Sequence, residues 1–314
     1  MTTTIETTWY ASLCEVEQQR VLFPAFDQAL KRISRVHVLT QAGSMPRSLM
    51  ILGPSGAGKS TVLAEYVRHF PFVEEPEQRR IPVLRAEIKA NPTVRSVAED
   101  ILKAMGCPMA YRGTVNEKTD RVVSSLKRFG VELLMLDEVQ HLLGATGRSF
   151  GSNNETEWLK TLLNLVDIPV VLSGLPYAEA LLTSNEQLRR RLDGICFMVP
   201  FSIEEDQSQA DFAGVVHWFD REIHAGRPIG LHEGDMLSRL FYASNGLIGY
   251  LLIDRIQIAI LEVFVSRPVK RVAAAFQNRV WDGIRGGQFQ PDRIESGIGD
   301  NVLSGNRSGI LRGE

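Results

Sequence analysis

The 314-residue sequence has little of what would place a protein in a membrane or outside the cell. It contains no apolar run approaching the roughly 18–20 residues that span a bilayer. Its N-terminus has neither the basic segment nor the apolar core of a secretory signal. The three cysteines, Cys14, Cys107 and Cys196, are far apart, show no metal-type pairing and fit buried thiols in a reducing compartment. We therefore expect a cytoplasmic protein with no membrane partner.

An excess of charge of either sign is also missing. Lysine and arginine total 35 residues and aspartate and glutamate 37, which gives a net charge of −2 and an isoelectric point near 6.3. This balance does not by itself indicate a nucleic-acid-binding protein, so any surface that binds nucleic acid has to be local. A hydrophobic content of 44% and a charged content of 23% are ordinary for a globular protein.

The most informative segment is the run G-P-S-G-A-G-K-S-T. It comprises Gly53, Pro54, Ser55, Gly56, Ala57, Gly58, Lys59, Ser60 and Thr61. An apolar run at residues 48–52 predicts a buried strand directly before it, and residues 61–67 predict a helix directly after it. A strand, a glycine-rich turn and a helix in this order are typical of a phosphate-binding loop. A glycine-rich surface turn is the alternative interpretation.

Each part of this loop has a predicted role in binding ATP and Mg²⁺. The glycines let backbone N–H groups face phosphate oxygens, where a Cβ atom would obstruct them. Lys59 can reach the β- and γ-phosphates, and the Ser60 hydroxyl can ligate Mg²⁺. The N-terminus of the following helix adds a dipole that favours bound anions.

A second part of the predicted nucleotide site lies at residues 131–138, V-E-L-L-M-L-D-E. This apolar strand ends in two carboxylates, and we expect it to lie beside the phosphate-loop strand. Asp137 is the predicted ligand of Mg²⁺ through water, and Glu138 is the predicted general base that polarises the attacking water. The adjacent acids favour hydrolysis of ATP over phosphoryl transfer to a small acceptor. A core strand capped by two solvated acids is the alternative.

Strands alternate with helices through the first two thirds of the chain, which predicts an α/β core built on a parallel sheet. Further strands are expected at residues 81–88, 168–174 and 195–199, helices at 93–105, 115–129 and 154–165, and a charged loop at 71–80. Beyond the core, only helices are expected, at residues 204–225, 233–243, 247–264 and 269–283. The predicted boundaries are a helical N-terminal extension at 1–40, interrupted by Pro24, the core at 41–202, a small helical domain at 203–283, and a glycine-rich, disordered tail at 284–314.

Two further candidate sites lie at the ends of predicted elements. Ser173 ends the strand at 168–174, where its hydroxyl can bond the attacking water or the γ-phosphate, or can satisfy the local backbone. Arg189, Arg190 and Arg191 precede the last strand of the core. They form either a solvated basic helix end, which suits the helix dipole, or the arginine finger that a ring-forming ATPase presents to the γ-phosphate bound by its neighbour. We favour the finger, with Arg190 and Arg191 ahead of Arg189.

A local excess of positive charge covers residues 89–128, where eight lysines and arginines accompany four acids. Contacts from lysine and arginine to phosphates dominate affinity for DNA. The predicted DNA-contacting residues are Arg112, Thr114, Lys103, Lys118 and Arg121. Arg112 is the first choice because it stands beside a turn at Gly113, where a side chain can project from the surface. A solvated helix face is the alternative interpretation of this charge.

Six segments carry a resemblance to known proteins: the phosphate loop, D-E-V-Q-H at 137–141, the strand ending in S-G at 173–174, L-R-R-R at 188–191, R-G-T-V at 112–115 and N-G-L-I-G-Y-L at 245–251. With them the chain resembles the AAA+ ATPases, and within these the TniB/TnsC family of transposition regulators, over about residues 15–280. The resemblance implies a five-stranded sheet of order 5-1-4-3-2 with a helical lid. It also implies ATP-dependent assembly of rings or filaments around double-stranded DNA, recruitment of a transposase, and contact with a target-selecting protein of the TniQ type.

One position departs from the AAA+ pattern. Many AAA+ proteins carry a lid arginine, often within G-x-x-R, that touches the γ-phosphate. Here Gly246 is followed by Leu247, Ile248 and Gly249, with no arginine until Arg255, so that role is not assigned. Two other functions compete with a transposition ATPase: a signalling or secretion ATPase that acts on proteins without DNA, and a nucleotide kinase. The adjacent acids and the all-helical second domain argue against the kinase.

Overall fold

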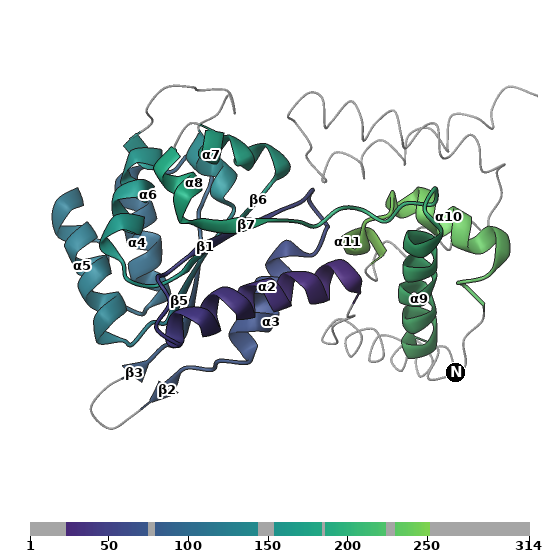
Figure 1. The fold of residues 1–314 in the computed structure, drawn as a ribbon, viewed down its shortest axis with the longest axis horizontal. Coiled ribbons are helices and arrows are strands. Elements are labelled where there is room, and N and C mark those ends of the chain that lie inside the picture. The colour runs from purple at the N-terminus through teal and green to yellow at the C-terminus, as the bar shows by residue number, and fades with distance from the viewer. Residues whose placement is uncertain (1–22, 75–78, 144–153, 184–185, 224–229, 252–314) are drawn as a thin grey trace, which may run out of the picture.

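The computed structural model describes residues 23–74, 79–143, 154–183, 186–223 and 230–251 (Figure 1). Residues 1–22 and 252–314 lie outside this description, and with them the helix expected at 269–283 and the tail expected to be disordered. Within the described ranges, none of the helices is long and apolar enough to cross a membrane.

Five parallel strands form the central sheet (Figure 1). They are β1 (Ser48–Leu52), β4 (Val83–Glu87), β5 (Leu133–Asp137), β6 (Val170–Gly174) and β7 (Leu192–Phe197). β1, β5 and β6 are buried along their whole length, as expected for parallel strands covered on both faces. The spatial order is β4-β5-β6-β1-β7, which is 5-1-4-3-2 when the five strands are counted along the chain. The predicted fold class and strand order are confirmed.

The neighbour predicted for the acidic strand is wrong. β5 does not pair with β1, because β6 lies between them: Leu136 of β5 pairs with Leu172, and Ile51 of β1 pairs with Ser173. Since all five strands are parallel, the ends of β1, β6 and β5 still meet at one edge of the sheet. β6 therefore places Ser173 between the phosphate loop and the acidic pair.

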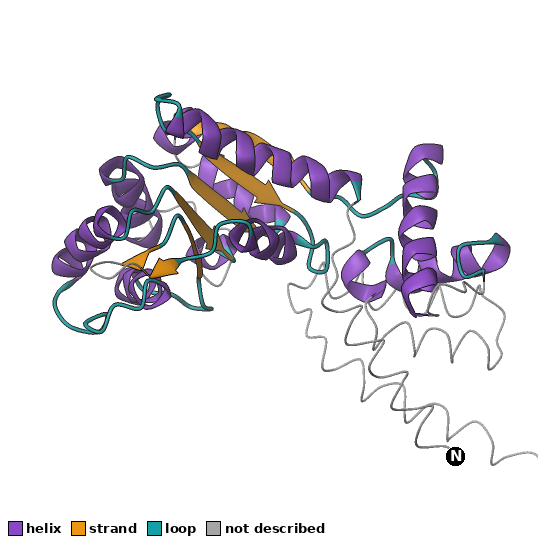
Figure 2. Cartoon of the chain, turned by 90° about the horizontal axis from the view of Figure 1, so that it is seen from below, coloured by secondary structure: helices purple, strands orange, loops and turns teal. Residues whose placement is uncertain are grey.

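Helices cover both faces of the sheet (Figure 2). One face carries α4 (Val94–Ala104), α5 (Val115–Arg128) and α6 (Asn154–Leu165), and the other carries α2 (Pro24–Gln41) and α3 (Lys59–Arg68). The 3₁₀ helices η1 (Val139–Leu143) and η2 (Pro176–Glu179) follow β5 and β6, and α7 (Ala180–Thr183) and α8 (Glu186–Arg191) precede β7. Alternate residues of a strand serve the two faces: Leu134 and Leu136 join one apolar cluster, and Leu133 and Met135 join the other.

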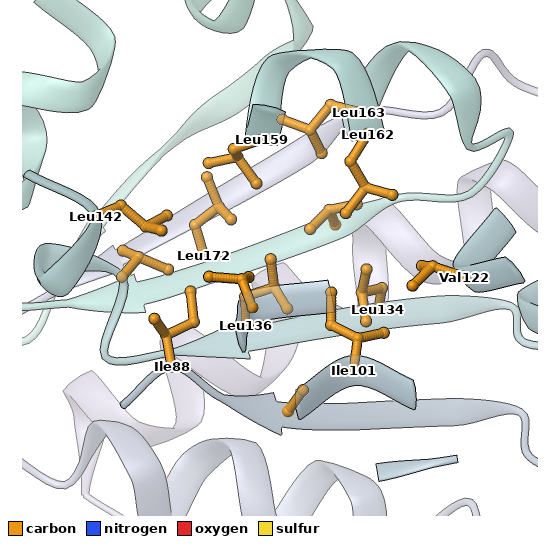
Figure 3. Close-up of a cluster of buried hydrophobic side chains, with 14 of the residues drawn as sticks. Ile88, Ile101, Val122, Leu134, Leu136, Leu142, Leu159, Leu162, Leu163 and Leu172 are labelled. Atoms are coloured by element: carbon orange, nitrogen blue, oxygen red, sulfur yellow. The ribbon is translucent and has the colours of Figure 1, made fainter. Parts of the chain in front are cut away.

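Figure 3 shows the first of these clusters at close range. Leu134 and Leu136 of β5 and Leu172 of β6 are buried together with Ile101 of α4 and Leu159 of α6. A close-packed apolar layer of this kind resists deformation. It gives fixed positions to the residues at the carboxyl ends of the strands, where the predicted site lies.

The helices that flank the sheet begin at residues typical of helix N-termini. Pro24, expected to interrupt a helix, is instead the first residue of α2, because its fixed φ angle suits the first helical position. Capping boxes begin α4 and α5: Thr93 and Ser96 exchange side-chain and backbone hydrogen bonds, and so do Thr114 and Glu117. The start of α5, next to the predicted DNA-contacting loop, is therefore well defined.

A short antiparallel hairpin replaces the charged loop expected at residues 71–80. Its strands are β2 (Val73–Glu74) and β3 (Arg79–Arg80). The Arg79 guanidinium lies 4.3 Å from the centre of the Phe72 ring, and Arg80 donates a 2.6 Å hydrogen bond to Glu132. Strands of two residues are too short to show a hydrophobic period, so the sequence does not predict them.

The described part of the lid consists of α9 (Asp206–Ile223), α10 (Gly234–Ser244) and α11 (Ile248–Leu251). The first two agree closely with the predicted helices, and α11 begins where the third is expected. Aromatic rings join the lid to the core: the Phe201 ring lies 5.6 Å from that of Phe23 and 5.5 Å from that of Phe212. The lid therefore packs against the start of α2, beside the carboxyl end of the sheet (Figure 1).

Candidate nucleotide-binding site

The phosphate loop joins the end of β1 to the start of α3, where the sequence predicts it. Gly56 and Gly58 have φ angles of +79° and +91°, a region in which glycine is favoured and the backbone can turn sharply. Gly53 meets a different constraint, because a Cβ atom there would lie 2.5 Å from the Met198 carbonyl oxygen. The three glycines thus permit a compact loop at the carboxyl end of the sheet.

Lys59, the first residue of α3, is buried beside the loop. Its Nζ atom donates 2.9 Å hydrogen bonds to the carbonyl oxygens of Gly53 and Pro54. Burial lowers the pKa of Lys59, and the negative charges of Glu138 and Asp137 oppose this lowering. The acids at the end of β5 therefore act electrostatically on the lysine of the loop. The structure brings the two predicted halves of the nucleotide site together.

Asp137 ends β5 and is almost completely buried. Its Oδ2 atom accepts a 2.8 Å hydrogen bond from Arg85 of β4, and its Oδ1 atom accepts a 3.1 Å bond from the Glu138 N–H. Because both carboxylate oxygens are held by the protein, Asp137 is better suited to act on Mg²⁺ through an intervening water than as a direct ligand.

Glu138 is held in an uncommon backbone conformation, with a φ angle of +60°. Gln140 holds its side chain: Gln140 Nε2 donates a hydrogen bond to Glu138 Oε2, and Gln140 Oε1 accepts a 3.2 Å bond from the Leu175 N–H. His141 Nε2 lies 4.0 Å from the same carboxylate. A left-handed conformation in a residue other than glycine costs free energy and persists where its surroundings hold it. Gln140, which links the ends of β5 and β6, is part of those surroundings.

Ser173 is completely buried on β6, between the phosphate loop and the acidic pair. Its Oγ atom has no hydrogen-bond partner among the residues that the structure describes. A buried hydroxyl without a partner costs free energy, and such exceptions are rare in folded proteins. A polar atom of a ligand beside the loop would supply the missing partner, whereas the local backbone does not.

These observations test whether the residues present fit ATP and Mg²⁺. The loop has the backbone freedom to surround phosphates, Lys59 lies beside it, and the Ser173 hydroxyl lacks a partner at the same edge of the sheet. Hydroxyl and carboxylate oxygens are ligands that Mg²⁺ prefers. The residues fit: Lys59 and the loop N–H groups would hold the phosphates, and Ser60 together with Asp137, through water, would hold the metal ion.

The three candidate finger arginines end α8 and differ in their surroundings. Arg189 and Arg190 have exposed side chains. Arg191 is half-buried and donates a hydrogen bond to the carbonyl oxygen of Leu163 in α6. An arginine anchored within its own subunit is poorly placed to reach a neighbouring one. This anchoring counts against Arg191 as the finger, and the finger role of these arginines stays a prediction.

The prediction that Lys118 contacts DNA is wrong. Its side chain is completely buried, donates a 2.9 Å hydrogen bond to the Ala110 carbonyl oxygen and lies 3.1 Å from a carboxylate oxygen of Glu99. Withdrawing this ammonium would leave a buried carbonyl and a carboxylate without their cation, which is costly. Lys118, in α5, is a structural residue that holds the loop preceding this helix.

Arg121, another predicted DNA contact, also binds this loop, residues 107–114. It donates to two carbonyl oxygens of the loop at 2.8 Å, Lys118 donates to a third at 2.9 Å, and Arg95 donates to a fourth at 3.3 Å. Three cationic side chains thus hold the loop backbone in one conformation. Two residues chosen for DNA contact turn out to shape the loop.

The remaining predicted DNA contacts are accessible to different degrees. Arg112 is exposed at the loop. Thr114 is exposed as well, but its hydroxyl donates to Glu117 and accepts from the Glu117 N–H as the cap of α5. Lys103 is one-third exposed and pairs with Asp100 at 3.2 Å. Arg112 therefore presents its charge at the surface, whereas Lys103 does so as part of an ion pair with Asp100.

Sequence reasoning did not identify two residues of the site, Arg85 and Gln140. Arg85 stands alone between apolar residues of β4, and its pairing with Asp137 follows from the parallel register of β4 and β5. Gln140 belongs to the D-E-V-Q-H run, and the 3₁₀ helix η1 brings it back to Glu138. Two signals in the sequence could have identified them. Arg85 is a lone cation in an apolar strand, and Gln140 is an amide just after an acidic pair.

Solved structures of two Aeropyrum pernix proteins resemble this one. The ORC1 protein in complex with DNA matches with a TM-score of 0.55 and 18% identity, covering 83% of this chain and 67% of that chain. The ORC2 protein in its ADPNP-ADP complexes matches with a TM-score of 0.52 and 14% identity, covering 79% and 67%. At these identities the likeness establishes the AAA+ fold alone. No curated protein matches the sequence.

A family profile described as "Bacterial TniB protein" matches residues 14–198. The match covers more than half of the 314 residues. It includes the phosphate loop, the acidic pair, Ser173 and the arginines of α8, so it contains the whole candidate site of the core. The chain belongs to the bacterial TniB family and has an AAA+ fold.

Proposed function

We propose that this protein is an ATPase of DNA transposition that assembles on double-stranded target DNA when ATP is bound and is reset by hydrolysis. In this role it links a target-selection protein of the TniQ type to the transposase. The observation that carries the proposal is the meeting of Lys59, the acidic pair 137–138 and the partnerless Ser173 hydroxyl at one edge of the sheet. Membership of the TniB family supports the role in transposition.

The geometry supports hydrolysis by attack of water on the γ-phosphorus of ATP. Glu138 takes a proton from the attacking water as its oxygen bonds to phosphorus, and the bond to the bridging oxygen breaks to release ADP. Ser173 bonds the water or a γ-phosphate oxygen, and Lys59 balances charge on the β- and γ-phosphates. Mg²⁺, when bound, neutralises further phosphate charge. Gln140 holds the Glu138 carboxylate in place for proton transfer.

The loop at residues 107–114, whose backbone is held by three cationic side chains, supports contact with DNA. Arg112 is exposed there, and the Lys103 ammonium lies 4.5 Å from the centre of the exposed Tyr111 ring beside it. Charges presented on a rigid backbone contact phosphates without reading bases, so binding is expected to be independent of sequence and to weaken steeply with salt. Among the structural neighbours, the ORC1 protein is seen in complex with DNA.

The proposal is tested by electron microscopy of the protein on linear duplex DNA, with and without a non-hydrolysable ATP analogue. We expect rings or filaments on the DNA that require the analogue. A protein that binds the analogue but never duplex DNA would favour the alternative, an ATPase that acts on protein partners.

Charge reversal locates the DNA-binding face. Arg112→Glu combined with Lys103→Glu is expected to abolish DNA-stimulated assembly while ATP binding by the monomer is kept. Lys127→Glu combined with Arg128→Glu is the matched control, because it makes the same charge change at exposed residues near the other end of α5. If the first variant coats DNA with unchanged salt dependence, the DNA-binding face lies elsewhere.

Assembly with an arginine finger predicts complementation between two inactive variants. A subunit with Arg189→Ala and Arg190→Ala supplies an intact phosphate loop, and a Lys59→Ala subunit supplies intact arginines. Mixing them is expected to recover part of the DNA-stimulated ATPase activity. Arg191→Ala is expected to lower thermal stability more than activity, since this residue holds α6. Absence of recovery at every mixing ratio would favour a solvated helix end.

A further inference from the structure

The lid touches the phosphate loop through the backbones of two glycines. The Gly249 N–H, in α11, donates a 2.8 Å hydrogen bond to the Gly56 carbonyl oxygen. A Cβ atom on Gly249 would lie 2.7 Å from the Gly56 Cα atom, a separation that real Cβ atoms essentially never show. The Tyr250 ring also lies beside Gly56, 3.4 Å from the position that a Cβ atom on Gly56 would take. The close approach therefore requires glycine at position 249.

A second glycine ties the same lid segment to the core. Gly246 has a φ angle of +67°, and its carbonyl oxygen accepts a 2.9 Å hydrogen bond from the Phe201 N–H in the connection between β7 and α9. A Cβ atom on Gly246 would clash with the Phe201 carbonyl oxygen. One short segment, G-L-I-G at 246–249, is thus bonded both to the core–lid connection and to the phosphate loop.

This segment stands where many AAA+ lids present an arginine to the nucleotide. In the described part of the lid, Arg221 pairs with Glu222 and Arg239 pairs with Asp235. Within residues 206–251 of the lid, leaving out 224–229, a main-chain hydrogen bond from Gly249 to Gly56 contacts the phosphate loop. A peptide group is planar, so fixing the Gly56 carbonyl also fixes the direction of the next N–H of the loop.

We propose that Gly249 is a positioning residue for ATP, an inference that rests on nucleotide binding in the proposed function. Its N–H holds the Gly56 peptide group, and so sets the shape of the loop that surrounds the phosphates. The contact of α11 with the phosphate loop and the binding of nucleotide to that loop are then coupled, and such coupling acts in both directions. A change that moves α11 away from the phosphate loop weakens nucleotide binding, and bound nucleotide stabilises the contact of α11 with the loop. In the part of the lid that the structure describes, the main chain at Gly249 links the lid to the nucleotide state.

Gly249→Ala tests this link, with Gly214→Ala as the matched control. At position 249 the added methyl group meets loop backbone, whereas at position 214, in α9, no described atom lies within 4 Å. The measurement is the affinity of each full-length protein for fluorescent analogues of ADP and ATP. We expect Gly249→Ala to bind about tenfold more weakly than the wild type, as for loss of one buried hydrogen bond. Gly214→Ala is expected to bind like the wild type.

Hydrogen exchange of the wild type gives a readout that needs no variant. On addition of ADP, exchange at residues 246–251 is expected to slow together with exchange at residues 53–58. In Gly249→Ala at saturating ADP, only the loop is expected to slow. The inference is overturned if Gly249→Ala and the wild type bind nucleotide with equal affinity. It is also overturned if hydrogen exchange at residues 246–251 does not change on addition of ADP. Either result leaves the proposed ATPase function intact. A wild type that binds no adenine nucleotide overturns both.

Discussion

Polar groups lie beside both ends of strand β5, and the two ends differ in how those groups are bonded. At the amino end, Glu132 accepts hydrogen bonds from Arg80 and Gln41. It also lies 3.3 Å from Nε2 of the buried His37, whose Nδ1 atom lies 3.0 Å from the Tyr66 hydroxyl. This amino-end network joins α2, α3 and β3 to the start of β5, and each of its side chains has a partner on another element.

At the carboxyl end, one buried hydroxyl lacks a partner among the described residues, and the backbone is strained at one residue. Ser173 keeps a buried hydroxyl that bonds to no described residue, and Glu138 has a left-handed backbone conformation. Unpaired groups and strained residues cost stability and are found where function uses them. We therefore expect substitutions at the carboxyl end to change ATP binding and turnover at little cost in stability, and matched substitutions at the amino end to do the opposite.

The comparison of Lys59→Ala with Arg80→Ala is expected to show the largest difference in nucleotide affinity and melting temperature. Charge-assisted hydrogen bonds to phosphate are strong, so Lys59→Ala should weaken nucleotide binding by about 100-fold or more and prevent assembly on DNA. Its melting temperature should stay near that of the wild type. Arg80→Ala loses its bond to Glu132 and should melt earlier while binding nucleotide normally. Calorimetric titration and thermal melts measure both; normal ATP binding by Lys59→Ala would contradict the role of the loop.

Glu138→Gln against Glu132→Gln compares the residues that directly follow and precede β5. Loss of a general base lowers turnover by about 10²- to 10⁴-fold. Glu138→Gln should therefore bind ATP, hydrolyse it slowly and remain assembled on DNA. Glu132→Gln should hydrolyse ATP at the wild-type rate and lose thermal stability. Phosphate release measures turnover, and a wild-type rate in Glu138→Gln would mean that another group is the base.

Gln140→Ala against Gln41→Ala compares the two amides that hold the acids at either end. Without Gln140, the Glu138 carboxylate is less well placed, and a small misplacement costs about tenfold or more in rate. We expect kcat to fall by about tenfold with KM nearly unchanged. Gln41→Ala should alter neither constant and should lower the melting temperature. If KM rises while kcat holds, Gln140 shapes nucleotide binding and not the acid.

The phosphate loop could be predicted from the sequence because its parts are consecutive. An apolar strand, three glycines, a lysine and a helix follow one another along the chain, and the structure has β1, the loop and α3 in those places. The apolar run before the acidic pair likewise predicts β5. Patterns that lie within one segment need no knowledge of the partners of that segment.

Contacts between distant segments were beyond what the residues alone could show. The pairing of Asp137 with Arg85 follows from strand register, and the place of β6 between β1 and β5 follows from the path of the whole chain. Lys118 is the clearest case: a lysine in a positively charged stretch indicates a surface contact. Its burial depends on Glu99 and on a carbonyl group of a loop that precedes its own helix.

His37→Gln is expected to give the smallest effect, a change in how stability depends on pH. Burial lowers the pKa of His37, and the hydrogen bond and charge of Glu132 only partly oppose it. In the unfolded chain the imidazole has its ordinary pKa, so the unfolded state takes up a proton first as the pH falls. The contribution to stability is complete above about pH 6.5 and is lost as the pH falls toward the lowered pKa of the folded state.

Glutamine cannot titrate, so the melting temperature of His37→Gln should depend less on pH than that of the wild type between about pH 7.5 and 5.5. At neutral pH the variant should be about 1–3 kcal/mol less stable, because buried hydrogen bonds to Tyr66 and Glu132 are disturbed. His69→Gln makes the same change at an exposed histidine just after α3 and is the matched control. Parallel slopes in His37→Gln and wild type would mean that other groups control acid stability. An altered nucleotide affinity in His37→Gln at neutral pH would show that the two ends of the sheet are coupled.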